Sequence, residues 1–158
     1  MALRTIVNST EDVLHKKCKE VSEVTDKTRE LLDDLVETMR AANGVGLAAP
    51  QVGILRRICV IEVPEDPKTY ELINPEIIFK EGDQYGEEGC LSVPGLCGDV
   101  HRPKKVKVKC LDRNGKEVIY EGKDLLARAF CHEIDHLDGH IYTEIADNIR
   151  DVNYGEEE

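Results

Sequence analysis

The segment of residues 123–137 most constrains the fold of this chain, because it predicts an amphipathic helix that carries two histidines. His132 and His136 are four residues apart, so on a helix both imidazoles project from one face and can reach a single metal ion. Leu125, Ala129 and His132 follow one another at intervals of four and three residues, so the histidines extend an apolar stripe. We expect this helix to be buried, with its reactive face lining a pocket.

The remaining elements predict an α+β domain. A short helix is expected from Asn8 to about Cys18, and a longer one over residues 26–42, where apolar residues recur every three or four positions. Strands are expected after it, at residues 57–63, 71–73, 76–79, 105–110 and 117–120, the last two joined as a hairpin. Helices at both ends with strands between them favour one domain, residues 1–146. Residues 147–158 are polar and acidic, and we expect them to form a flexible tail.

Composition excludes several classes of protein. The 158 residues are 41 % hydrophobic and 34 % charged, as in a globular domain, and no apolar run approaches the roughly 20 residues that span a membrane. No signal peptide is evident, so a cytoplasmic location is expected. The net charge of −11 argues against a dedicated nucleic-acid surface, because such surfaces depend on Lys and Arg. The six cysteines include no Cys-x-x-Cys pair, and we expect most of them to be reduced.

A catalytic metal site is predicted by a cysteine motif together with the two histidines. Two imidazoles leave a tetrahedral site two ligands short, and the thiolate of Cys90 can supply the third. The fourth position would then be open to water, as in catalytic sites. Glu133 lies one position around the helix from His132, where its carboxylate can contact that water. These residues predict a metal-dependent hydrolase.

A loop of small residues, 44–53, is the third motif with a chemical interpretation. Glycine and alanine leave room beside the main chain, so a substrate backbone can approach closely. The side-chain amide of Gln51 can donate a hydrogen bond to a developing oxyanion. The loop lacks the Gly-Lys-Ser/Thr ending of a phosphate-binding loop.

The three motifs together resemble the peptide deformylase family. They read Gly-x-Gly-x-Ala-Ala-x-Gln at residues 44–51, Glu-Gly-Cys-x-Ser at 88–92 and His-Glu-x-x-His at 132–136. The resemblance extends over nearly the whole chain and ends before the acidic tail. It implies antiparallel and mixed β-sheets packed around a central C-terminal helix. It also implies the reaction, in which the N-formyl group of the initiator methionine of newly made peptides is hydrolysed and formate is released.

The resemblance further implies the role of each site residue. Cys90, His132 and His136 would bind the metal, with Fe²⁺ as the physiological ion. Zn²⁺ or another divalent metal would be a substitute, and the ligands alone are at least as natural for zinc. Glu133 would act as general base and then general acid, while the Gln51 amide and the Leu91 N–H would stabilise the oxyanion. The substrate main chain would pair with Gly44, Val45 and Gly46, and methionine would enter a pocket formed by Val45, Leu125 and Ala129.

Partners and neighbouring residues follow from the same resemblance. N-formylmethionyl peptides are the expected partners, with a transient ribosome contact and no membrane association. We expect Glu88 to pair with Arg102, and Asp135 either to orient a histidine or to face solvent. The sequence departs from the family at Cys131, often a glutamine and here interpreted as a core thiol. It also departs at Cys97, where many members carry an arginine that contacts the substrate backbone. If the Cys97 thiol were exposed at the cleft, it would be open to oxidation.

Two alternatives are open at this stage. A zinc endopeptidase would share the His-Glu-x-x-His motif but would take a third ligand C-terminal to it, such as His140 or Glu144. A non-catalytic metal-binding or interaction domain is the other alternative. It would be expected to lose Glu133, Cys90 or Gln51, and all three are present.

Overall fold

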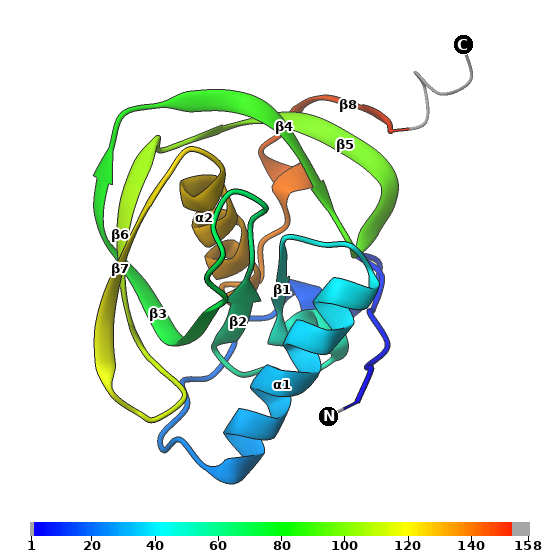
Figure 1. Cartoon of the computed structure of the whole chain (residues 1–158). Coiled ribbons are helices and arrows are strands. Elements are labelled where there is room, and N and C mark those ends of the chain that lie inside the picture. The colour runs from blue at the N-terminus through cyan, green and yellow to red at the C-terminus, as the bar shows by residue number, and fades with distance from the viewer. Residues whose placement is uncertain (1, 153–158) are drawn as a thin grey trace.

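Helix α2 (Leu125–Leu137) lies at the centre of the fold, with strands on several sides of it (Figure 1). The computed structural model describes residues 2–152. Eleven residues of α2 are buried, and the helix contacts strands of both β-sheets. Its apolar side chains share a core with the large sheet and include Phe130, which packs edge-on against Tyr70. The predicted α+β fold around a C-terminal helix is therefore confirmed.

Two sheets surround this helix. The larger sheet has the strand order β1-β2-β3-β6-β7, formed by Gly46–Ala48, Ile58–Ile61, Tyr70–Glu81, Lys105–Leu111 and Glu117–Lys123. The smaller has the order β4-β5-β8, formed by Gln84–Cys90, Val93–Arg102 and Asp147–Asp151. Neighbouring strands in both sheets are antiparallel, and an isolated parallel bridge joins Lys19 to Arg56.

The predicted hairpin of β6 and β7 is confirmed, and its burial follows the sequence pattern. Val106, Val108 and Cys110 are buried, while the intervening lysines are only partly buried. This alternation is what a sheet with one core face produces. Strand β3 differs from the prediction, because the two short strands expected there are one strand with a register shift between Ile73 and Glu76. Pro75 lies inside this irregularity, where its missing N–H interrupts no regular ladder.

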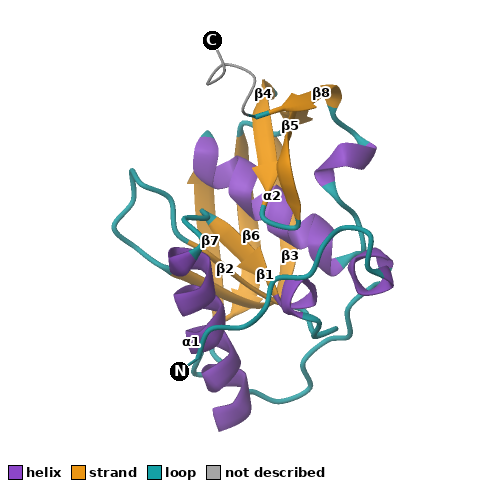
Figure 2. Ribbon diagram, turned by 90° about the vertical axis from the view of Figure 1, so that its right-hand side faces the viewer, coloured by secondary structure: helices purple, strands orange, loops and turns teal. Residues whose placement is uncertain are grey.

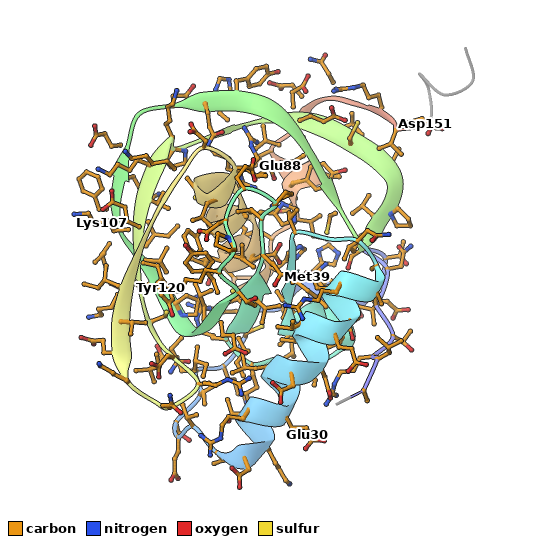
Figure 3. All side chains as sticks on the ribbon, viewed as in Figure 1. Glu30, Met39, Glu88, Lys107, Tyr120 and Asp151 are labelled. Carbon is orange, nitrogen blue, oxygen red and sulfur yellow. The ribbon has the colours of Figure 1, made fainter. Side chains whose placement is uncertain are left out.

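Helix α1 (Asp26–Ala41) packs its apolar stripe against the large sheet (Figure 1). Thr25 and Thr28 form a capping box at its start. The stripe predicted from the sequence is buried, with Leu32, Leu35 and Met39 fully enclosed. Figure 3 shows Met39 and Glu88 inside the molecule, whereas Glu30, Lys107 and Asp151 lie at its periphery.

Three short 3₁₀ helices complete the described elements: η1 (Asp12–His15), η2 (Ala49–Val52) and η3 (Tyr142–Glu144). The helix expected from Asn8 to Cys18 is only the single turn η1. Within residues 2–152, no helix is long and apolar enough to cross a membrane.

The flexible tail expected from Asp147 is wrong for its first five residues. Asp147–Asp151 forms strand β8, which lies beside β5 at the edge of the small sheet (Figure 2). All five residues are exposed, so β8 is joined to the sheet mainly by backbone pairing and has no apolar pattern to reveal it. Residues 153–158 of the expected tail lie outside the described residues.

Candidate metal and active site

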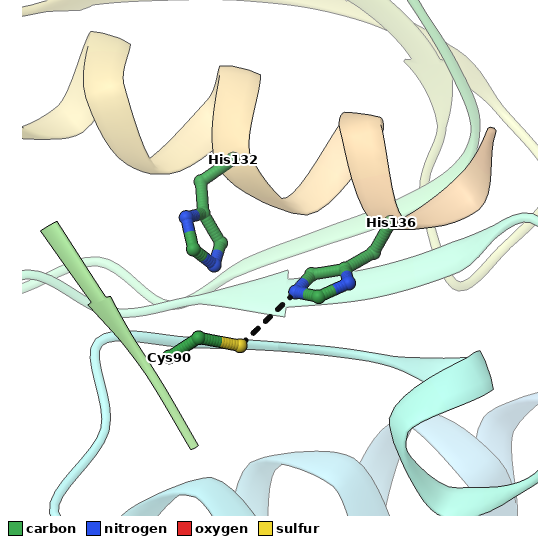
Figure 4. A group of neighbouring side chains, drawn as sticks. All are labelled: Cys90, His132 and His136. Atoms are coloured by element: carbon green, nitrogen blue, oxygen red, sulfur yellow. Dashed lines mark hydrogen bonds between the residues drawn. The ribbon is translucent and has the colours of Figure 1, made fainter. Parts of the chain in front are cut away.

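The three predicted metal ligands meet between β4 and α2. Cys90 is the last residue of β4, and His132 and His136 project from α2 toward it (Figure 4). One ligand atom from each lies within 4.8 Å of the other two, and Cys90 Sγ is 3.3 Å from His136 Nε2. A thiolate and two imidazoles at this spacing form a donor set suited to one Zn²⁺ or Fe²⁺ ion.

Glu88 holds His132 in the orientation that such a site requires. Its Oε1 atom lies 2.8 Å from His132 Nδ1, which leaves Nε2 of the same ring free to bind a metal. The predicted pairing with Arg102 is confirmed, because the guanidinium donates to both carboxylate oxygens at 2.8 and 3.0 Å. Although burial alone would raise the pKa of Glu88, hydrogen bonds from Arg102 and His132 lower it to about 2. Glu88 is therefore ionised and accepts the His132 N–H.

Asp135 belongs to the same ionic network. Its carboxylate accepts a 2.6 Å hydrogen bond from Arg102, so it orients the arginine rather than a histidine. Its side chain is 35 % exposed, which agrees in part with the expectation of a solvated helix position.

Glu133 lies beside the three candidate ligands with an unused oxygen. The residue is buried, and its Oε1 has no hydrogen-bond partner within residues 2–152. Its Oε2 is 4.0 Å from His132 Nε2. Burial raises the pKa of Glu133 to about 7. A buried carboxylate with a free acceptor and a pKa near neutrality is suited to exchange a proton with water or substrate.

Gln51 is held in place by three hydrogen bonds. Its side-chain oxygen accepts from the Ala48 N–H at 2.9 Å, and its Nε2 donates to Ser92 Oγ at 3.1 Å and toward Cys90 Sγ at 3.5 Å. The amide nitrogen therefore lies next to the candidate metal site. The sequence assigned no role to Ser92 beyond its place in the Glu-Gly-Cys-x-Ser motif. In the structure its hydroxyl accepts a hydrogen bond from Gln51 and so holds that side chain in place.

A cavity of about 450 Å³ opens beside the candidate metal site. The predicted substrate-binding residues all line it, together with Gln51 and Leu91: Gly44, Val45, Gly46, Leu125 and Ala129. The volume is within the usual range for a small-ligand cleft. Other residues at this cavity had no predicted binding role, among them Glu87, Leu96, Arg128 and Val152. Leu96 and Val152 gave no signal, because the pairing of β5 with β8 brings them there.

Because Gly46 has no side chain, it leaves room for the Glu133 side chain as well as for a substrate. A Cβ atom at this position would lie 2.5 Å from Glu133 Oε2 and 2.9 Å from its Cγ and Cδ. At Gly44 a Cβ would lie 2.7 Å from Leu91 Cδ1. The two glycines therefore let the chain pack closely against site side chains as well as line the cavity.

The cysteines flagged in the sequence are both buried. Cys131 packs in the main core, as expected for a core thiol. Cys97 is 3 % exposed, opposite Gly89 on β4 and Arg150 on β8, and it does not line the cavity. The oxidation liability that would follow from exposure of Cys97 at the cleft has no support in this geometry.

The C-terminal ligands of an endopeptidase site do not join the cluster. The helix ends before Gly139, whose φ of +81° is a left-handed conformation that glycine adopts readily. His140 Nδ1 then lies 3.2 Å from Glu144 Oε1, and the two exposed side chains pair with each other. Of the residues described, the structure groups only Cys90, His132 and His136 as candidate ligands.

Fold and site together define a metal-dependent hydrolase, with a cysteine–dihistidine cluster, an adjacent buried glutamate and a substrate-sized cavity. Comparison with known proteins narrows this class. Residues 3–152 match the polypeptide deformylase family. A peptide deformylase of Agathobacter rectalis is 56 % identical over 155 residues, which are 98 % of this chain and 97 % of that protein.

Solved structures agree with the sequence comparison. The peptide deformylase of Ehrlichia chaffeensis in complex with actinonin has a TM-score of 0.90 and 39 % identity, covering 94 % of this chain and 91 % of that one. The Thermotoga maritima enzyme has a TM-score of 0.89 and 35 % identity, covering 93 % and 99 %. This chain belongs to the polypeptide deformylase family, whose members are metal-dependent hydrolases that remove the N-formyl group from new peptides.

Proposed function

We propose that Cys90, His132 and His136 bind the catalytic metal ion with which this enzyme deformylates N-formylmethionyl peptides and releases formate. The observation that carries the proposal is that the three ligand atoms lie within 4.8 Å of one another. In addition, Glu88 binds His132 Nδ1, the ring nitrogen that faces away from the candidate metal position. We propose Fe²⁺ as the physiological ion, with Zn²⁺ or another divalent metal as a substitute. When bound, such an ion lowers the pKa of water and polarises a carbonyl group.

Glu133 is the proposed general base and general acid. Its Oε1, which has no hydrogen-bond partner among residues 2–152, can accept a proton from the attacking water and then deliver it to the peptide nitrogen as the C–N bond breaks. The proton passes from water to carboxylate to amine, so the free amino group and formate are the products. Burial beside the cavity keeps the carboxylate away from bulk water during this transfer.

Gln51 and Leu91 are proposed to stabilise the oxyanion that forms on the formyl group. The Gln51 amide nitrogen is aimed at Cys90, and Leu91 follows Cys90 directly at the wall of the cavity. A donor placed in this way typically contributes about 2.7–4 kcal/mol to the transition state.

The substrate is proposed to lie extended beside Gly44, Val45 and Gly46, pairing its main chain with theirs. The methionine side chain would enter the cavity against Val45, Leu125 and Ala129, which all line it. A formyl carbon carries only hydrogen, so a narrow approach to Glu133 would exclude larger acyl groups by size.

We place this activity in the cytoplasm, where new peptides emerge from the ribosome. A transient ribosome contact would bring the enzyme to its substrate. The net charge of −11 favours a contact made through the peptide over one made through a broad basic surface.

Formate release from a formyl-methionyl peptide tests this proposal. The protein would be purified without oxygen and loaded with Fe²⁺, and Glu133→Ala would be the matched control. We expect rapid release by the native chain and a loss of at least about 10²–10⁴-fold in the variant, which removes the acid–base group. Bound metal, measured by elemental analysis, should be retained in the variant.

Two outcomes would contradict the proposal. A folded, metal-loaded chain that releases no formate would not be a deformylase, and cleavage of an unformylated protein would then identify an endopeptidase. Equal metal content in the native chain and in Cys90→Ser would exclude Cys90 as a ligand.

A further inference from the structure

Arg128 is a buried arginine beside the proposed site to which the mechanism above assigns no role. It lies on α2 four residues before His132 and is 7 % exposed. Its NH1 atom donates to Glu88 Oε2 at 2.7 Å and to the backbone oxygens of Gly86 at 3.3 Å and Val100 at 3.2 Å. One guanidinium therefore ties the catalytic helix to both β4 and β5.

The Glu88 carboxylate accepts four hydrogen bonds from three residues. Oε1 binds His132 Nδ1 and Arg102, whereas Oε2 binds Arg102 and Arg128. Figure 3 shows Glu88 beside α2, the helix that carries two of these three partners. The carboxylate thus bridges two consecutive turns of one helix.

Arg128 adds a second guanidinium to the ionic network around Glu88. Glu88 and Asp135 are the two carboxylates of the network, and Arg102 is shared between them. Arg128 is the second cation, and Glu88 is the carboxylate with which it pairs. Without Arg128, the guanidinium of Arg102 alone would be shared between two carboxylates, and the buried Glu88 carboxylate would lose one of its two cationic partners.

The position of Cys90 depends on the same contact. Cys90 is two residues beyond Glu88 on β4, while His132 and His136 are on α2. Gly86 allows the arginine to approach, because a Cβ there would lie 3.2 Å from Arg128 NH2. The Arg128–Glu88 hydrogen bond therefore connects β4, which carries Cys90, to the helix that carries the two imidazoles.

We propose that Arg128 is a positioning residue for deformylation, which acts by locking the Glu88 carboxylate against His132 Nδ1 and by placing Cys90 opposite the two histidines. The inference rests on the proposed metal-binding role of Cys90, His132 and His136. Mutation of a group that orients a metal ligand typically reduces metal affinity or activity 10- to 100-fold. We expect an effect of that size from Arg128.

The test compares Arg128→Met and Arg128→Lys with the native chain. Arg40→Met is the control, because Arg40 likewise pairs with one glutamate but does so at the surface, where its Nε and NH2 atoms donate to Glu62. The first readout is the proton NMR signal of His132 Nδ1–H in metal-free protein, assigned with a His132→Gln sample. The second is Zn²⁺ affinity in competition with a chelating dye, and the third is kcat and KM of the Fe²⁺ enzyme.

We expect Arg128→Met to move or broaden the Nδ1–H signal, to weaken Zn²⁺ binding 10- to 100-fold and to lower kcat more than it raises KM. Arg128→Lys should recover part of each loss, because a single ammonium can still reach Glu88. Arg40→Met should match the native chain in all three readouts. If Arg128→Met does not fold, the lysine variant serves for the same comparison.

An unchanged Nδ1–H signal together with native Zn²⁺ affinity in a folded Arg128 variant would overturn the proposal. The NMR readout needs neither metal nor activity, so it judges the role of Arg128 separately from the proposed function. If instead the native chain binds no metal, the proposed function fails, whatever the Arg128 variants show.

Discussion

At the scale of single residues, Gly46 lies in close contact with Glu133. The Glu133 side chain fills the space that a Cβ at position 46 would need, with three of its atoms within 2.9 Å of that point. Both the carboxylate and the Cγ atom of Glu133 would have to shift to make room for that Cβ. A side chain at position 46 would therefore displace the proposed base.

We expect Gly46→Ala to lower kcat by about 10²-fold, because a displacement of a catalytic group by 1 Å can have an effect of that size. Metal content should not change, since the atoms nearest to a Cβ at Gly46 belong to Glu133 and not to the three candidate ligands. Steady-state kinetics with formyl-methionyl peptide, combined with elemental analysis, checks both parts. Native kcat in the alanine variant would show that Glu133 needs no such space.

At the scale of elements, helix α2 begins at an unfavourable backbone conformation. Asp124 precedes the helix with φ 54° and ψ −120°, a region that residues with a side chain rarely adopt. Its backbone is held there by three hydrogen bonds: its N–H donates to Lys104, and its carbonyl accepts from Arg128 N and Gln84 Nε2. The strain lies at the start of the helix that carries the site.

We expect Asp124→Gly to stabilise the protein, because strain of this kind amounts to about 1–3 kcal/mol and glycine avoids it. Loss of the acidic charge at the helix N-terminus offsets part of the gain. A net gain of about 1 kcal/mol would raise Tm by roughly 2–4 °C in a domain of this size. Asp124→Ala, measured by the same thermal scan, should lower Tm, because alanine keeps the strained conformation and removes the acidic charge at the helix N-terminus.

A surface ion pair between Arg40 and Glu62 joins α1 to the large sheet. Arg40 on α1 binds Glu62, which follows β2, and Thr69 donates to the same carboxylate. Hydrogen bonds from Arg40 and Thr69 lower the pKa of Glu62 from 4.5 to about 2. The ionised form therefore stabilises the folded state.

Because the folded pKa is depressed, this stabilisation is fully present above pH 4.5 and is lost as pH falls toward 2. We expect Glu62→Gln to be less stable than the native chain at pH 6, with a difference that shrinks steadily below about pH 4.5. Urea unfolding of both proteins from pH 6 to pH 3.5 measures it. A difference that stays constant on acidification would show that Glu62 has an ordinary pKa when folded.

At the scale of the whole molecule, the proposed metal site joins the small sheet to the central helix. Cys90 comes from β4, and both histidines come from α2. A metal bound there links the small sheet to an element that also packs against the large one. Binding should therefore stabilise the whole domain and not only the site.

We expect Zn²⁺ at 100 times its Kd to add about 2.7 kcal/mol, by the mass-action relation for a ligand that binds the folded state. In a domain of about 150 residues this corresponds to a rise in Tm of roughly 5–10 °C. A chelator should reverse the rise, and Cys90→Ser should show little of it. An equal rise in Cys90→Ser would place the stabilising ion elsewhere.

Much of the fold and the candidate site was predictable, for reasons that are local. Helix periodicity predicted α1 and α2, and alternation predicted the β6–β7 hairpin. Strands β4 and β5 were missed because residues 84–102 include four glycines and little alternation. Their conformation depends on pairing with each other and, for β5, with β8.

The sequence by itself determined the chemistry of the protein: two histidines one helical turn apart, a glutamate between them, and cysteine and glutamine motifs upstream. Spacing within one helix is a local property, so it can be interpreted without the fold. Only the tertiary structure decided that Glu88 is shared by Arg102, Arg128 and His132, that Ser92 anchors Gln51, and that β8 closes the edge of the small sheet. Those contacts join residues far apart in the chain and depend on strand register and charge pairing in the interior, which no single segment encodes.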